Sequence, residues 1–191
     1  MKEGKFDGLW KHYLLMLIVF FVSAFAGYYT SLNNPPAAVT QVETLSREFA
    51  FVKKMSPLLI FLLIFANNSI KALISTVAGT FAGIFPVCFV AINGYIVGVV
   101  YCVKGQQIGY TTALLYLIPH GVIEIPAILL ACSYGTWLGM RFLKKVRGEK
   151  VNFGEDFKMA IKACLKNVVP LLFVAALIET FITPLVVRLF S

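Results

Sequence analysis

The stretch SPLLIFLLIFANNSIKALISTVAGTFAGIFPVCFVAINGYIVGVVYCV, residues 56–103, decides the fold, and Lys71 is its only charged residue. A membrane-spanning helix needs about 20 mostly apolar residues to cross about 30 Å of hydrocarbon. Two such segments lie in the stretch, at about residues 56–78 and 85–103, and only a few residues around Gly79–Gly83 separate them. We therefore predict two membrane-spanning helices that form a tight antiparallel hairpin.

Outside this stretch, three further segments are long and apolar enough to span a bilayer. They lie at about residues 10–31, 111–140 and 168–190. The segment at 111–140 contains Pro119 and Pro126, so we expect it to tilt or to kink. The sequence thus predicts an all-α bundle of five transmembrane helices, in a single integral membrane domain over residues 1–191.

The composition supports the same fold class. Hydrophobic residues make up 59% of the 191 residues and charged residues make up 14%, whereas a soluble domain has about half and about a quarter. This composition excludes a soluble globular protein. The net charge is +8, but no segment remains for a water-facing domain that would bind nucleic acid. The lipid bilayer is therefore the first expected partner.

The first span has one alternative interpretation, as a cleaved signal peptide. Three lysines precede its apolar core, and Ala24-Phe25-Ala26 resembles a cleavage site. The apolar run continues to Tyr29, however, and so favours a retained helix.

The distribution of Lys and Arg predicts the orientation. With five spans, eleven of these residues fall on the side of the N-terminus and of the loop between the last two spans, and five fall on the opposite side. Positive charge accumulates on the cytoplasmic side of membrane proteins. We therefore expect a multi-pass protein of the cell membrane with its N-terminus in the cytoplasm and its C-terminus outside.

Two amphipathic segments connect the spans. Residues 38–53 carry apolar side chains at helical spacing (Val42, Leu45, Phe49 and Val52), which predicts a helix on the outer membrane surface. Residues 154–167 carry an apolar face that continues to Val168 (Phe157, Ile161, Leu165 and Val168). On another face they carry a lysine every four residues (Lys158, Lys162 and Lys166). These lysines suit either anionic lipid headgroups or a protein partner in the cytoplasm.

Polar side chains also occur at membrane depth, where they are costly and seldom face lipid. They are Asn67, Asn68, Lys71, Ser75, Asn93, His120, Glu124 and Glu179. Small residues recur near them at four-residue spacing, as in closely packed transmembrane helices; these are Gly79, Gly83, Gly94, Gly98, Ala131, Gly135 and Gly139. Because polar and small residues share a face in two of the spans, we expect Lys71, His120 and Glu124 to point into the packed centre.

Three roles are open for this polar cluster. It fits a structural network in which Lys71 pairs with Glu124 or Glu179 and the asparagines bridge helices. It also fits a transport or proton path, which intramembrane ionisable groups often mark. Catalysis fits least, since His120 and Glu124 are too few ligands for zinc and no nucleophile–base pair is evident. We therefore expect a protein that is not an enzyme, with no catalytic residue, metal or cofactor.

A set of motifs in a fixed order resembles a known family. The motifs are Phe65-Ala66-Asn67-Asn68 with Lys71-Ala72, then Gly79 and Gly83, then Asn93-Gly94 with Gly98, then Pro119-His120-Gly121 with Glu124. Over about residues 60–140 the chain is similar to the stage II sporulation protein M family of polytopic membrane proteins. The resemblance implies a scaffold that brings peptidoglycan-degrading partners to a membrane and is not itself the hydrolase. It marks Asn67, Asn68, Asn93, His120 and Glu124 as motif positions without an assigned role.

Two hypotheses about function follow. The first is a non-enzymatic membrane scaffold, or a subunit of a multiprotein complex, that recruits protein partners through its amphipathic segments and self-associates through its glycine faces. The alternative is a transporter, or the permease-like subunit of an exporter. In that case Lys71, His120 and Glu124 line the path, and the basic cytoplasmic helix seats an ATPase.

Overall fold

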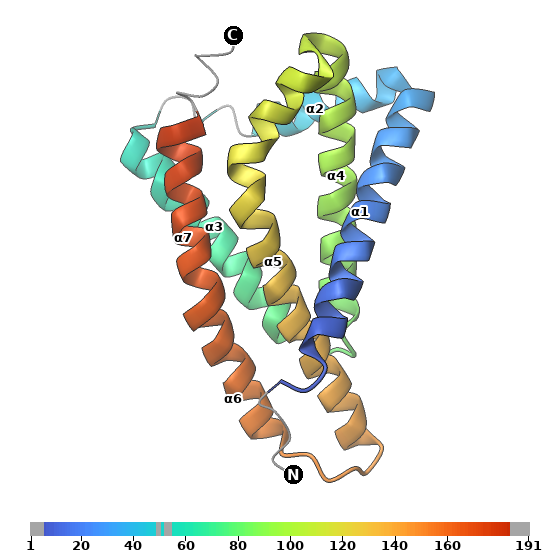
Figure 1. Ribbon diagram of the computed structural model, residues 1–191, viewed down its shortest axis with the longest axis vertical. Helices are drawn as coiled ribbons and strands as arrows, with labels where there is room; N and C mark the ends of the chain where they lie inside the picture. Colours follow the sequence, from blue (N-terminus) through green and yellow to red (C-terminus); the bar gives the residue numbers. More distant parts are fainter. Residues whose placement is uncertain (1–5, 49–50, 52–54, 184–191) are drawn as a thin grey trace.

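A computed structural model of the chain describes residues 6–48, 51 and 55–183, without the side chains of Glu48, Tyr116, Pro119 and His120. Within these residues the chain is helical and contains no strand. Five helices in this part of the chain are long and apolar enough to cross a membrane, which confirms the prediction of an all-α, multi-pass bundle. Figure 1 shows an elongated bundle with a short helix, α2, near one end.

The first three spanning helices follow the predicted segments closely. They are α1 (Leu9–Asn33), α3 (Pro57–Ala78) and α4 (Ile84–Ile108). Ser56 caps α3, because its hydroxyl accepts a hydrogen bond from the Leu59 amide at 3.4 Å. Pro57 then takes the first helical position, where a missing N–H removes no hydrogen bond.

The connection between α3 and α4 is short, as predicted, but the two helices do not pack as a hairpin. α4 lies along α1, whereas α3 packs mainly against α5 and α7, so α3 and α4 contact each other over few residues (Figure 1). Gly83 ends the connection with a φ of 73°, a left-handed conformation that glycine adopts without strain. This turn lets the chain leave in a new direction, and α1 rather than α3 becomes the neighbour of α4.

The fourth spanning helix, α5 (Tyr110–Val146), is longer than the predicted segment and has 37 residues. At 1.5 Å per residue it is about 55 Å long, well beyond the roughly 30 Å of hydrocarbon. Its helical conformation continues through Pro119 and Pro126, and in Figure 1 the ribbon changes direction along its first half. A bend in an unbroken helix is the usual effect of an internal proline.

The last span corrects one prediction, because the amphipathic segment 154–167 is not a separate helix. α6 (Phe153–Ala163) continues through a π-helical turn, η2 (Cys164–Val168), into α7 (Val169–Leu177) and a second such turn, η3 (Ile178–Ile182). Asn152 caps the start of this run by accepting a hydrogen bond from the Glu155 amide at 3.4 Å. The wide η2 turn lies just before Pro170, which has no amide hydrogen to donate. Residues 184–190 of the predicted span lie outside the described residues.

The other amphipathic segment forms α2 (Pro35–Glu48), which begins earlier than predicted. Ala38 and Val42 are buried against Val99 and Val103 of α4. One face of α2 is therefore covered by α4. The predicted apolar positions Phe49 and Val52 lie outside the described residues.

The small residues hold the bundle together from inside. A Cβ built on Gly94 or Gly98 would overlap backbone atoms of α1, and one built on Gly79 would overlap the backbone at Gly135 of α5. The same holds for Gly139 against the turn at Gly83, and Ala131 is fully buried. These small-residue faces are therefore occupied by contacts within the chain.

Candidate functional site

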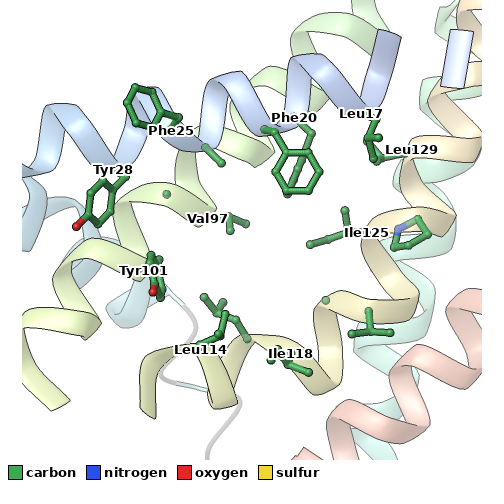
Figure 2. Close-up of a pocket in the computed structure, with 17 residues that line it drawn as sticks. Leu17, Phe20, Phe25, Tyr28, Val97, Tyr101, Leu114, Ile118, Ile125 and Leu129 are labelled. Carbon is green, nitrogen blue, oxygen red and sulfur yellow. The ribbon is translucent and has the colours of Figure 1, made fainter. Parts of the chain in front are cut away.

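A hollow in the described part of the molecule lies between α1, α4 and the first half of α5. Its volume is about 610 Å³, within the usual range for small-molecule sites. Figure 2 shows apolar side chains from all three helices directed at a common space, among them Phe20, Val97, Leu114 and Ile125. Exposed residues at its rim, such as Phe25 and Val122, indicate that it opens toward lipid rather than toward water.

A smaller chamber of about 120 Å³ adjoins this cavity and contains its polar groups. Asn93 of α4 and Glu124 of α5 line the chamber, which shares the walls Phe20, Leu117 and Gly121 with the larger cavity. The Asn93 amide nitrogen donates a hydrogen bond to the Phe89 carbonyl oxygen at 2.6 Å. The arrangement is an apolar cavity with a carboxylate and an amide at its inner end.

Part of the predicted polar cluster is therefore brought together here. Asn93 and Glu124 line one chamber, and Gly121 of the Pro-His-Gly motif forms its wall. The side chain of His120 lies outside the described residues. A carboxylate and an amide in an apolar site suit a hydrogen-bond donor or a cation on an otherwise apolar molecule. Among the described residues, no group of three potential ligands could hold a metal ion.

The α3 side of the predicted cluster lies elsewhere. Ser75 is fully buried and Asn68 is half-buried, but Asn67 and Lys71 are exposed on the outside of α3. The expected direction of Lys71 is therefore wrong. Four residues in an α-helix rotate by about 40° more than a full turn, so the line from Asn67 through Lys71 and Ser75 to Gly79 winds around the helix. It begins on the outer face and ends against α5.

The expected ion pairs of Lys71 are also wrong. Among the described residues, no salt bridge joins Lys71 to Glu124 or to Glu179. Glu179 lies in η3 and is half-buried. Lys71 faces away from the α3 surface that packs on α5 through Ala72 and Thr76. A charged side chain that faces lipid near the bilayer centre costs about 2.5 to 3.5 kcal/mol.

The basic lysines occupy the outer face of the last helical run, as predicted. Lys158, Lys162 and Lys166 are all exposed, and Lys158 lies 3.7 Å from the carboxylate of Glu155. The buried face of the run is formed by Asp156, Ala160 and Cys164. The predicted apolar positions Phe157, Ile161 and Leu165 flank this face, and Leu165 is exposed.

A second polar cluster was missed by the sequence analysis. Arg141 of α5 makes a 2.7 Å salt bridge with Asp156 of α6, and its guanidinium lies 5.7 Å from the ring centroid of Trp137. Phe6 packs on the same surface, with its ring 5.0 Å from those of Tyr134 and Trp137. Arg141 is one of the basic residues between the last two predicted spans, and its spacing of 15 residues from Asp156 across a helix–loop–helix connection was a usable signal.

Comparison with known proteins gives a consistent result. The sequence profile described as Stage II sporulation protein M matches residues 16–184. An uncharacterized protein of Methanocaldococcus jannaschii is 31% identical over 129 residues, which are 65% of this chain and 56% of that protein. The match thus spans little more than half the length of this relative. No solved structure matches the chain.

Proposed function

The chain belongs to the stage II sporulation protein M family, and from this premise we propose that it is a membrane subunit of a multiprotein complex. In this role it is not an enzyme and needs no catalytic residue, metal or cofactor. The observation that carries the proposal is a rigid, basic hairpin formed by the end of α5 and by α6.

The hairpin extends beyond the rest of the bundle. In Figure 1 the end of α5 and the start of α6 reach past the connection between α3 and α4. Three contacts brace it: the Arg141–Asp156 salt bridge at 2.7 Å, the Phe142 and Phe153 rings at 5.5 Å, and Lys145 at 5.6 Å from the Phe153 ring centroid. A braced projection keeps a binding surface ordered before its partner arrives, which reduces the entropy lost on binding.

The charge of the hairpin indicates the kind of partner. Its exposed basic residues are Lys144, Lys145, Arg147, Lys150, Lys158 and Lys162, against the exposed acids Glu149 and Glu155. Such a surface complements an acidic protein surface. Its excess of positive charge favours the cytoplasmic side, and Phe6, which packs on Trp137 at the base of the hairpin, favours a cytoplasmic N-terminus as well.

A quantitative pull-down tests the proposal. The tagged full-length protein is purified from membranes of its native host in mild detergent, beside a variant with Lys144, Lys145, Lys158 and Lys162 changed to Gln. We expect a cytoplasmic protein in near-stoichiometric amount with the natural sequence, and a loss of about tenfold or more with the variant, since four charge contacts at about 0.5 kcal/mol each exceed one decade.

The control is Lys104→Gln, which removes an exposed lysine at the end of α4. It should leave the recovery of the partner unchanged. Capture that survives the four substitutions, or the absence of any stoichiometric partner, would contradict the proposal. Repeating the capture in nanodiscs of uncharged lipid separates protein binding from binding to anionic headgroups.

Transport is a second candidate function, and the cavity between α1, α4 and α5 favours it. A volume of about 610 Å³ that adjoins a chamber with Asn93 and Glu124 suits passage or storage of an apolar molecule with a polar group. Lys71 is not part of such a path, because its side chain is exposed on the outside of α3. Recovery of an ATPase as the hairpin-dependent partner would favour the exporter subunit, whereas recovery of an envelope enzyme would favour the scaffold.

A further inference from the structure

A polar patch interrupts the outer surface of α3. Asn67 and Lys71 lie four residues apart and are exposed, beside the exposed side chains of Ile70 and Ile74. Among the described residues, Lys71 makes no salt bridge or hydrogen bond, and Asn67 donates to the Asn68 side-chain oxygen at a long 3.4 Å. We call these four residues, Asn67, Ile70, Lys71 and Ile74, the α3 patch.

The patch lies within the membrane-spanning part of the helix. α3 has 22 residues and is therefore about 33 Å long, close to the thickness of the hydrocarbon. Lys71 lies seven residues before Ala78, about 10 Å from the nearer helix end, and Asn67 lies about 16 Å from it. Both side chains are within the bilayer rather than at its surface.

Extension of Lys71 to the headgroups does not account for the patch. Side chains leave an α-helix toward its N-terminus, which here is away from the nearer end and toward the membrane centre. The short amide of Asn67, one turn deeper, has no means of reaching water. Two polar groups on one face at this depth therefore indicate a surface that another polar group covers in the assembled complex.

We propose that the α3 patch binds a transmembrane helix of a partner protein that carries an Asp or Glu at mid-membrane depth. This inference rests on the proposed function and names the chemistry of one partner. The lysine supplies a positive point charge with three hydrogen-bond donors, and Asn67 adds an amide. Ile70 and Ile74 provide the apolar contact beside these groups.

A second copy of the chain is a poorer occupant than a different protein. A symmetric contact would place the two copies of Lys71 in the same interface, where like charges repel. The chain's own acids at membrane depth do not lie on this surface, because Glu124 lines the chamber between α4 and α5 and Glu179 lies half-buried in η3. The complementary carboxylate therefore has to come from another protein.

Energy transfer in vesicles tests the proposal with a defined probe. The labelled full-length protein is reconstituted in phosphatidylcholine vesicles with a synthetic polyleucine transmembrane helix that carries one central Glu, or Leu at that position. We expect the Glu helix to associate about tenfold more tightly than the Leu helix, as for polar contacts between membrane helices. Lys71→Leu should remove this preference, and the control Lys104→Leu should retain it.

The inference is overturned by equal association of both probe helices, or by a preference for Glu that survives Lys71→Leu. The oligomeric state of the protein without a probe helix is measured by light scattering. A dimer that dissociates in the Lys71→Leu variant would overturn the inference as well. Because Lys71 is exposed, the variant should fold, and its circular dichroism spectrum verifies this. Capture through the basic hairpin is measured separately, so a failure of this inference is distinguishable from a failure of the proposed function.

Discussion

The two halves of α5 belong to one helix but have opposite surroundings. In the second half, each residue from 131 to 139 is buried, because α3 and the α6–α7 run pack closely around it. In the first half, Leu114, Ile118 and Val122 are exposed and line the cavity toward α1 and α4. Both halves are apolar, so apolarity does not decide which one packs.

Side-chain size explains the difference. The buried half contains Ala131, Cys132, Ser133, Gly135, Thr136 and Gly139, whereas the open half contains Leu114, Leu115, Leu117 and Ile118. Lipid tails are as apolar as leucine, so helices in a membrane associate where small residues let their backbones approach. One half of α5 thereby becomes the rigid base of the hairpin, and the other half leaves room for a ligand.

The largest expected effect is the difference in stability between two glycine-to-alanine variants, one in each half of α5. A Cβ on Gly135 would overlap the Ser75 carbonyl oxygen. A Cβ on Gly121 would meet, among the described side chains, only the Ile125 Cδ1 atom, at 3.2 Å. Because backbone has little freedom to move, Gly135→Ala should destabilise the protein by about 3 kcal/mol or more. Gly121→Ala should stay within about 0.5 kcal/mol, since the Ile125 side chain can rotate and alanine favours the helix.

Unfolding of both variants in mixed micelles with increasing SDS, followed by circular dichroism, measures these differences. Equal losses of stability in the two variants would show that the two halves of α5 do not differ in packing.

This contrast also explains how far the sequence could predict the structure. The five spans and the small-residue faces were predictable, because hydropathy and four-residue spacing are local signals. The direction of Lys71 was not, since a four-residue repeat winds around the helix and does not say which of its members meets a neighbour. The cavity depends on the angle between α5 and α1, two helices separated by more than seventy residues, and no local pattern encodes that angle.

A smaller effect is expected at the end of the rigid half, where Arg141 and Asp156 join α5 to α6. Their atoms are 2.7 Å apart, and the side chains are 22% and 11% exposed. Asp156→Asn removes a charge-assisted hydrogen bond and leaves a partly buried guanidinium, so we expect a loss of about 1.5 to 3 kcal/mol. Hydrogen exchange should show faster opening of residues 141–160 before the rest of the bundle.

Glu155→Gln is the matched control for this change. Its salt bridge with Lys158 is 3.7 Å long, and both side chains are 69% exposed, so its loss should cost less than about 0.5 kcal/mol. If both substitutions had the same small effect, the hairpin would not depend on the Arg141 contact for its rigidity.

The smallest expected effect concerns a single hydroxyl between α3 and the rigid half of α5. The Thr76 hydroxyl lies 3.0 Å from the Ala72 carbonyl oxygen of its own helix and 3.1 Å from the Ala131 carbonyl oxygen of α5. Thr76→Val keeps the shape and removes the contact between helices, so we expect a loss of about 0.6 kcal/mol and at most about 1.7. Thr136 is also buried, but among the described residues its hydroxyl bonds only to the Cys132 and Ser133 carbonyl oxygens of its own helix, so Thr136→Val should change stability by less. Measured in the same SDS titration, an equal loss for the two variants would mean that close backbone packing alone, without this hydrogen bond, holds α3 to α5.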